Sequence, residues 1–176
     1  MKTSNSLATL VALSSLLSSA GCASRGEVAT SASAAAQDAP VKHRIAGSFD
    51  VTLKPQPEAQ DVGDPAIGRM SADKQFHGAL EALSKGQMLG VRTAVKDSAG
   101  YVAMEHVVGT LDGRTGTFVL QHSTTMNRGV PRQSITVVPD SGTADLAGLA
   151  GSMTIDIKDG QHFYDFEYWF EAPPKS

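Results

Sequence analysis

The sequence predicts an all-β protein: a small closed antiparallel β-barrel of about eight strands, preceded by a signal peptide and a disordered tether. The first observation is a run of alternating residues, 101–126, that is broken by Asp112-Gly113, as in a β-hairpin with a tight turn. The second is that turn-forming residues recur at short intervals. The third is that few segments show a helical period, so most connections suit neighbouring antiparallel strands.

The beginning of the chain has the layout of a secretory signal. A lysine precedes an apolar stretch, residues 7–17, which small residues close. Residues 20–22 read Ala-Gly-Cys and match the end of a bacterial lipobox, in which the thiol of Cys22 would take a diacylglycerol, although Ser19 stands where that motif usually has Leu. The alternative is an ordinary signal cut nearby, with Cys22 discarded. Residues 1–22 therefore predict export, with Cys22 as the lipidation site.

The rest of the chain divides into a linker, one domain and a tail. Residues 23–44 are rich in Ala and Ser without a sustained hydrophobic period, which predicts a flexible linker. The barrel domain is expected over residues 45–172, and 173–176 form a short tail. Apolar residues make up 41% of the chain, the net charge is −3 and no basic stripe is present. We therefore expect a globular domain that does not bind nucleic acid.

About eight strand-like runs lie between the turn signals. They cover residues 47–53, 68–78, 81–93, 101–111, 115–126, 133–138, 152–158 and 162–171. The start of the third is ambiguous, because residues 79–85 could also form a helical turn. A meander of this kind avoids exposed edges most simply by closing on itself. Its interior would then be filled by side chains or would hold one small ligand.

Four segments together resemble a known bacterial family. They are GRMSADKQFHG (residues 68–78), GYVAMEHVVGTLDGRTGTFVLQHS (100–123), SITVVPDSGTADLAGLAGSMTI (134–155) and HFYDFEY (162–168). The sequence is similar to a family catalogued only as a domain of unknown function, whose fold resembles the allene oxide cyclase and dirigent barrels. The resemblance implies a small closed antiparallel barrel that often self-associates. The catalytic residues of cyclases and dirigent proteins match no positions here, so those activities enter by analogy of fold alone.

The hairpin determines which side chains share a face. With Asp112-Gly113 as the turn, Ala103 faces His122, so Glu105 and His122 lie diagonally on one face among apolar neighbours. A turn centred on Gly113-Arg114 would place the two directly opposite, and a loop with an odd number of residues would separate them. On a luminal face, desolvation would raise the pKa of Glu105 and a histidine partner would oppose that shift. Such a pair could exchange protons with a ligand, or simply satisfy its own hydrogen bonds.

Aromatic residues gather on the last strand. Tyr164, Phe166 and Tyr168 share a face that we expect to be interior, where they could stack on a flat apolar ligand or pack as core. The predicted catalytic residues are Glu105 and His122, and the predicted ligand-binding residues are Gln121, on the opposite face, with Phe118, Leu120, Tyr164, Phe166 and Tyr168.

No metal or cofactor is expected. The five histidines include no His-x-His pair and no HExxH motif, and the only cysteine lies at the lipobox-like position. His77, at the end of a strand, is expected at the rim of the barrel. Residues 148–152, GLAGS, lack the lysine of a phosphate loop and predict a tight turn or a strand bend.

These observations leave three hypotheses for function. The leading one is an exported, lipid-anchored barrel, in the periplasm or at the outer membrane, that binds a small apolar or aromatic molecule in its lumen. The second is a cofactor-independent cyclase or isomerase that uses Glu105 and His122 for proton transfer. The third is a structural cell-envelope interaction module with a filled barrel, whose outer face is the functional surface. Self-association as a homo-oligomer, which the family resemblance implies, is compatible with each hypothesis.

Overall fold

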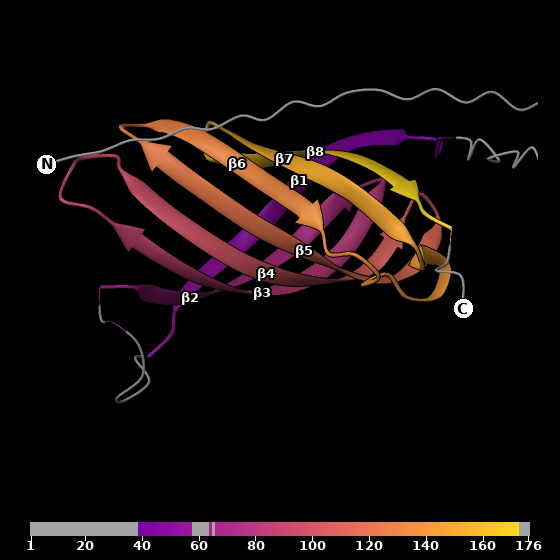
Figure 1. The fold of residues 1–176 in the computed structure, drawn as a ribbon, viewed down its shortest axis with the longest axis horizontal. Coiled ribbons are helices and arrows are strands. Elements are labelled where there is room, and N and C mark those ends of the chain that lie inside the picture. Colours follow the sequence, from indigo (N-terminus) through magenta and orange to yellow (C-terminus); the bar gives the residue numbers. More distant parts are fainter. Residues whose placement is uncertain (1–38, 58–63, 65, 173–176) are drawn as a thin grey trace, which may run out of the picture. The chain divides into compact units, whose positions relative to one another are not determined.

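The computed structural model describes residues 39–57, 64 and 66–172 (Figure 1). The chain divides into two units, Met1–Gln37 and Asp38–Ser176, and all described residues lie in the second. The predicted signal peptide with Cys22, most of the linker and the tail lie outside the described residues. In the part of the chain that is described, no helix has both the length and the apolar character needed to cross a bilayer.

Eight antiparallel strands form the barrel, each paired with the next in the chain, and β8 pairs with β1 to close it. The strands cross the barrel obliquely (Figure 1). They are β1 (His43–Pro55), β2 (Gly68–Gly78), β3 (Leu80–Arg92), β4 (Ala99–Leu111), β5 (Arg114–Asn127), β6 (Val130–Val137), β7 (Leu149–Lys158) and β8 (Gln161–Phe170). A short 3-10 helix, η1 (Ala144–Leu146), lies between β6 and β7. The predicted fold class is confirmed.

The strand ends differ from the predicted ones in ways that the turns explain. β7 begins at Leu149, directly after Gly148, whose φ of +77° is readily available to glycine. The turn expected over residues 148–152 is therefore confined to its first residue, and the rest belongs to β7. The stretch that could have been a helical turn, residues 79–85, is strand from Leu80 onward.

The β4–β5 hairpin has the predicted register. Asp112 and Gly113 have φ values of +47° and +80°, as a type I′ turn requires. Ala103 pairs with His122, and Glu105 pairs with Leu120. Glu105 and His122 therefore lie diagonally on one face, and the two other turn geometries are excluded.

Alternate residues of each strand point into the lumen, and their burial divides it into two halves. The packed half lies toward the β2–β3, β4–β5 and β6–β7 connections, and its inward-facing side chains are buried: Phe49, Phe76, Leu80, Leu111, Phe118, Leu120, Leu149, Tyr164, Phe166 and Tyr168. The open half lies toward the β1–β2, β3–β4, β5–β6 and β7–β8 connections. Its inward-facing side chains stay partly exposed, among them Val51, Met70, Met88, Tyr101, Met126 and Ile155.

Aromatic rings fill the packed half. Phe118 and Phe166 stack with their ring centres 6.1 Å apart, and Leu146 of η1 is 1% exposed. The ring of Tyr164 lies directly on Gly47, where a Cβ atom would come within 2.5 Å of the phenol oxygen. The glycine thus makes room for the ring, and this half of the lumen is a conventional core.

The thinnest join in the ring lies between β6 and β7. These strands share two register pairs, Ile135 with Met153 and Thr136 with Ser152. The side chain of Gln133 extends the join, because its Nε2 donates to the carbonyl oxygen of Ile155 at 2.8 Å and its Oε1 accepts from the Ile155 amide at 3.1 Å. A side-chain amide therefore takes the place of a backbone pair.

Candidate functional site

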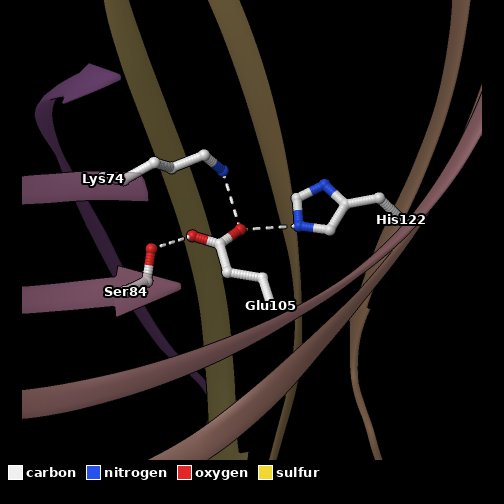
Figure 2. Close-up of polar contacts among 4 residues, drawn as sticks. All are labelled: Lys74, Ser84, Glu105 and His122. Carbon is white, nitrogen blue, oxygen red and sulfur yellow. Dashed lines mark hydrogen bonds and ion pairs between the residues drawn. The ribbon is translucent and has the colours of Figure 1, made fainter. Parts of the chain in front are cut away.

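Four polar side chains converge inside the barrel, at the boundary between its halves (Figure 2). Glu105 lies at the centre with its side chain 3% exposed. Its Oε2 accepts a hydrogen bond from Lys74 Nζ at 2.7 Å and lies 2.8 Å from His122 Nε2. Its Oε1 accepts a hydrogen bond from the Ser84 hydroxyl at 2.5 Å. We call these four residues the polar cluster.

Strand geometry brings the polar cluster together from β2, β3, β4 and β5. Lys74 lies directly opposite Ser84 in the β2–β3 register, and Ser84 lies opposite Val107 in the β3–β4 register. Glu105 is the inward-facing residue next to Val107, toward the open half. The predicted pair of Glu105 and His122 is thus real, but it is half of a larger arrangement.

The polar cluster holds Glu105 in its ionised form. Burial alone would raise its pKa, since the interior disfavours a charged carboxylate. The hydrogen bond from His122, the charge and hydrogen bond of Lys74 and the hydrogen bond from Ser84 together outweigh burial and lower the pKa from 4.5 to about 2. Desolvation and His122 oppose each other as the sequence predicts, and the result is a carboxylate with three donors.

Lys74 is itself well enclosed. Its side chain is 8% exposed, and its ammonium nitrogen lies 4.9 Å from the ring centre of Phe49 and 5.6 Å from that of Phe76. An unpaired ammonium in this position would be costly, because its hydration is lost. The carboxylate of Glu105 and the two ring faces replace that hydration.

Two polar atoms at the polar cluster have no hydrogen-bond partner among the described residues, His122 Nδ1 and Thr124 Oγ1, and of the two only Thr124 Oγ1 is fully buried. An ionised carboxylate only accepts, so His122 Nε2 donates the proton of this hydrogen bond, and an imidazole with a single proton then has Nδ1 as an acceptor. No described residue bonds to this Nδ1, which points away from Glu105 in Figure 2. Thr124, the next inward-facing residue on β5, is 9% exposed, and its buried Oγ1 has no partner among the described residues.

The predicted ligand-binding residues lie mainly in the packed half. Phe118, Leu120 and Phe166 are each at most 1% exposed. Gln121 lies on the outer face, as predicted, and its side chain is exposed. A ligand would reach the three buried side chains only if the core opened.

The two tyrosines of β8 are occupied by the barrel itself. Tyr164 donates to the carbonyl oxygen of His77 at 3.2 Å and accepts from the amide of Leu80 at 3.3 Å, and burial raises its pKa. Tyr168 donates to Asp112 Oδ2 at 2.5 Å. Burial, followed by the neighbouring carboxylate of Asp112, raises the pKa of Tyr168 to about 12. Both phenols therefore tie the packed half to its turns.

The outer face carries a separate hollow of about 1250 Å³. It lies over β2 to β5 and is lined by outward-facing side chains and by residues of the β1–β2 connection, including Ile67, Arg69, Lys85, Leu89, Val102, Met104, His106 and Gln121. The lining also includes inward-facing residues of the same strands, among them Met70, Met88, Glu105 and His122.

Exposed apolar side chains recur along the outer face of β3 and β4, in two groups that the pair of Lys85 and His106 separates. Leu83 lies opposite Val108, and Leu89 lies opposite Val102. With Met104, these side chains are between 47% and 62% exposed. We call these five residues the outer stripe. Exposed apolar side chains that adjoin, as Leu89, Val102 and Met104 do, are typical of contact surfaces, whereas single ones are ordinary.

Metal ligands do not converge in the part of the chain that the structure describes, where no three His, Cys, Asp or Glu side chains could hold an ion together. His77 lies beside Asp50, with its Nε2 3.0 Å from Oδ2, on the outer side of the barrel wall. The expectation that no metal or cofactor is bound stays a prediction.

The fold and the site together define a class of protein, a small up-and-down antiparallel barrel of eight strands with an ion pair buried in its lumen. Residues 45–168 match the family described as "Protein of unknown function (DUF3224)", and the chain belongs to this family. The resemblance seen in the sequence is confirmed. The likeness of the fold to allene oxide cyclase barrels stays a prediction.

A solved structure supports the same assignment. The chain is similar to a protein of unknown function from the DUF3224 family of Shewanella oneidensis MR-1, known from a crystal structure. The two are 50% identical, the match covers 75% of this chain and 100% of that one, and the TM-score is 0.68. Among curated proteins no match is found.

Sequence reasoning missed three polar residues of the lumen: Lys74, Ser84 and Thr124. Lys74 precedes Phe76 by two positions and Thr124 follows His122 by two, so strand alternation gives each of them an inward direction. That alternation was the available signal. It did not show that β2 and β4 lie close enough across β3 for Lys74 to reach Glu105.

Proposed function

We propose that the chain binds a small apolar molecule in the open half of the barrel, with the polar end of the molecule beside His122 and Thr124. The observation that carries this proposal is that Thr124 Oγ1 is buried without a partner among the described residues and that none of them bonds to His122 Nδ1, while Glu105 accepts three hydrogen bonds. A buried polar atom without a partner is unfavourable, and a ligand would relieve it.

The walls of the open half suit an apolar ligand. Met70, Met88 and Met126 face inward from three strands, and methionine adapts its shape to irregular partners. Tyr101 adds an aromatic face for stacking. The site differs from the one predicted from the sequence, because the aromatic face of β8 is taken up by the core.

If the barrel catalyses an isomerisation or cyclisation, its base is better assigned to His122 than to Glu105. A carboxylate with a pKa of about 2 and three donors is a weak base. His122 Nδ1 points away from Glu105 and bonds to no described residue, and Glu105 would orient the ring. The cofactor-independent enzyme thus remains the second hypothesis, with the two roles exchanged.

A pair of substitutions distinguishes a ligand bound in the open half of the lumen from a ligand bound in the outer hollow. Met88 faces inward and Met104 faces outward, one strand apart. We expect Met88→Arg to abolish the heat of binding of 4-pentylphenol in calorimetric titrations, and Met104→Arg to leave it unchanged. The opposite result would move the ligand to the outer hollow, and no binding to the parent protein would reject the proposal.

The outer stripe favours a second candidate function, an interaction module of the cell envelope whose partner is a second copy of the chain. The charges beside the stripe balance, since Asp73 lies opposite Lys85, so an identical face is not repelled. We expect Val102→Glu to dissociate the protein to monomers in analytical ultracentrifugation. A parent protein that is already monomeric at about 100 µM would rule this candidate out.

The proposed location is the cell envelope, reached by export and by lipidation of Cys22. A lipid anchor would hold the barrel at a membrane surface through its linker. We expect Cys22→Ser to move the protein from the membrane fraction to the soluble fraction of the cells. An unchanged membrane fraction would count against the anchor.

A further inference from the structure

We infer that the site in the open half selects molecules that carry an O–H group, with His122 Nδ1 as the acceptor of that proton. This inference rests on the proposed function and adds to it the chemistry of the ligand's polar end. It follows from a chain of hydrogen bonds that begins at Glu105 and ends at the lumen.

The direction of the chain is set by Glu105. Its carboxylate accepts from Lys74 and Ser84 and has no proton to give, so the bond to His122 must use a proton on Nε2. A neutral imidazole carries one N–H, so its Nδ1 offers a lone pair. The hydrogen bond from Nε2 to Glu105 therefore leaves the other ring nitrogen of His122, Nδ1, as the acceptor that is presented to the lumen.

The acceptor discriminates between ligand classes. An alcohol, a phenol or an undissociated acid donates its proton to Nδ1. An ether, ester or ketone brings a second acceptor and has no O–H proton, so it leaves the lone pair of His122 Nδ1 without a donor. The difference between a made and an unmade buried hydrogen bond corresponds to about 10- to 100-fold in affinity.

Thr124 provides a second hydrogen-bonding group at this site. Its hydroxyl is buried without a partner among the described residues, and it can donate as well as accept. A ligand hydroxyl that gives its proton to His122 Nδ1 still has an oxygen that can accept a proton, and Thr124, the next inward-facing residue on β5, carries a hydroxyl without a partner among the described residues.

Charge balance favours a neutral ligand. The ammonium of Lys74 and the carboxylate of Glu105 compensate each other within the lumen, 2.7 Å apart. An anionic head group would bring a further charge without a counter-charge, which a buried site disfavours. A neutral O–H group adds none.

The test compares two probes that differ by one methyl group, 4-pentylphenol and 4-pentylanisole. Calorimetric titration of the folded protein should show the phenol binding at least about 10-fold more tightly. His122→Phe should remove this preference. The matched control His106→Phe, on the exposed outer face of β4, should retain it.

The outcomes separate the inference from the function on which it rests. Equal affinity of the two probes for the parent protein would overturn the inference and leave the proposed function standing. Failure of both probes to bind would reject the proposed function. A preference that survives His122→Phe would also overturn the assignment of the acceptor.

A spectroscopic test addresses Glu105 as the positioning residue without requiring a ligand. The ¹⁵N chemical shifts of His122 should show the proton on Nε2 in the parent protein. In the double variant Lys74→Met/Glu105→Leu, which leaves no buried charge unpaired, this preference should be lost and the phenol should lose its advantage. A proton on Nδ1 in the parent spectrum would overturn the inference even if a variant fails to fold.

Discussion

The two halves of the lumen share strands but not chemistry. In the packed half, β8 and β5 contribute rings such as Phe166 and Phe118, which stack and exclude water. Toward the open half, β5 contributes His122 and Thr124, and β2, β3 and β5 contribute Met70, Met88 and Met126 in place of rings. Apolar packing holds the barrel together, whereas the polar cluster at the boundary costs desolvation and is poorly explained by stability alone.

The largest expected effect lies in the packed half. Phe166→Ala should lower the free energy of unfolding by about 3–5 kcal/mol, because the cavity it leaves is surrounded by rigid rings. Urea denaturation measures this loss. Met88→Ala in the open half, as the matched truncation, should cost about 1 kcal/mol, since that side chain is partly exposed. Similar losses for the two variants would break the distinction between the halves.

The second prediction concerns the ion pair at the boundary. Lys74→Met should destabilise the fold by about 3–5 kcal/mol, because it leaves the buried Glu105 carboxylate without its counter-charge. Lys74→Met/Glu105→Leu should recover most of the loss. Chemical denaturation of the single and double variants forms the test. If the double variant is less stable than the single variant, the ion pair itself contributes to stability through packing, and its presence needs no functional explanation.

Acid should weaken the boundary through the same carboxylate. The pKa of Glu105 is lowered from 4.5 to about 2 in the folded state. The stabilisation is therefore complete above pH 4.5 and is lost as the pH falls through the folded value, by on the order of 3 kcal/mol. Denaturation midpoints across this window should fall steeply in the parent protein and more gently in Glu105→Gln. If the midpoints of the two proteins fall in parallel with pH, groups other than Glu105 cause the acid sensitivity.

The smallest expected effect concerns the pKa of Tyr168 in the packed half. Asp112→Asn removes the carboxylate charge beside Tyr168 while keeping a residue that tolerates the turn. The pKa of Tyr168 should fall from about 12 toward the usual range of tyrosine. Tyrosinate absorbance during alkaline titration reports it. Asp97→Asn, in the β3–β4 turn, should leave the titration unchanged.

The sequence was sufficient for the hairpin register and for closure of the barrel. Asp112 and Gly113 can both take positive φ, and this local requirement fixes the pairing of every residue from Ala99 to Met126. Closure of the barrel was predictable because a long meander with unpaired edge strands is prone to aggregation. Both predictions depend on short-range or fold-wide rules, and neither needs side-chain detail.

The site was predictable only in part. The Glu105–His122 pair follows from the hairpin, but Lys74 enters from β2, and its approach depends on how the strands stagger around the barrel. Which half is filled depends on the summed volume of the inward side chains against the width of the lumen. The helix η1 escaped notice because it is held by Thr143 and Thr117, which lie far apart in the sequence.

The amide of Gln133 has a consequence for solubility. Beyond the backbone pair of Ile135 with Met153, on the side of the open half, the hydrogen bonds between β6 and β7 are those that the Gln133 side chain makes with Ile155. Without this side chain, backbone donors and acceptors along two neighbouring strands would lie bare, and bare strand edges recruit other chains. We therefore expect Gln133, a residue remote from the polar cluster, to oppose polymerisation of the protein.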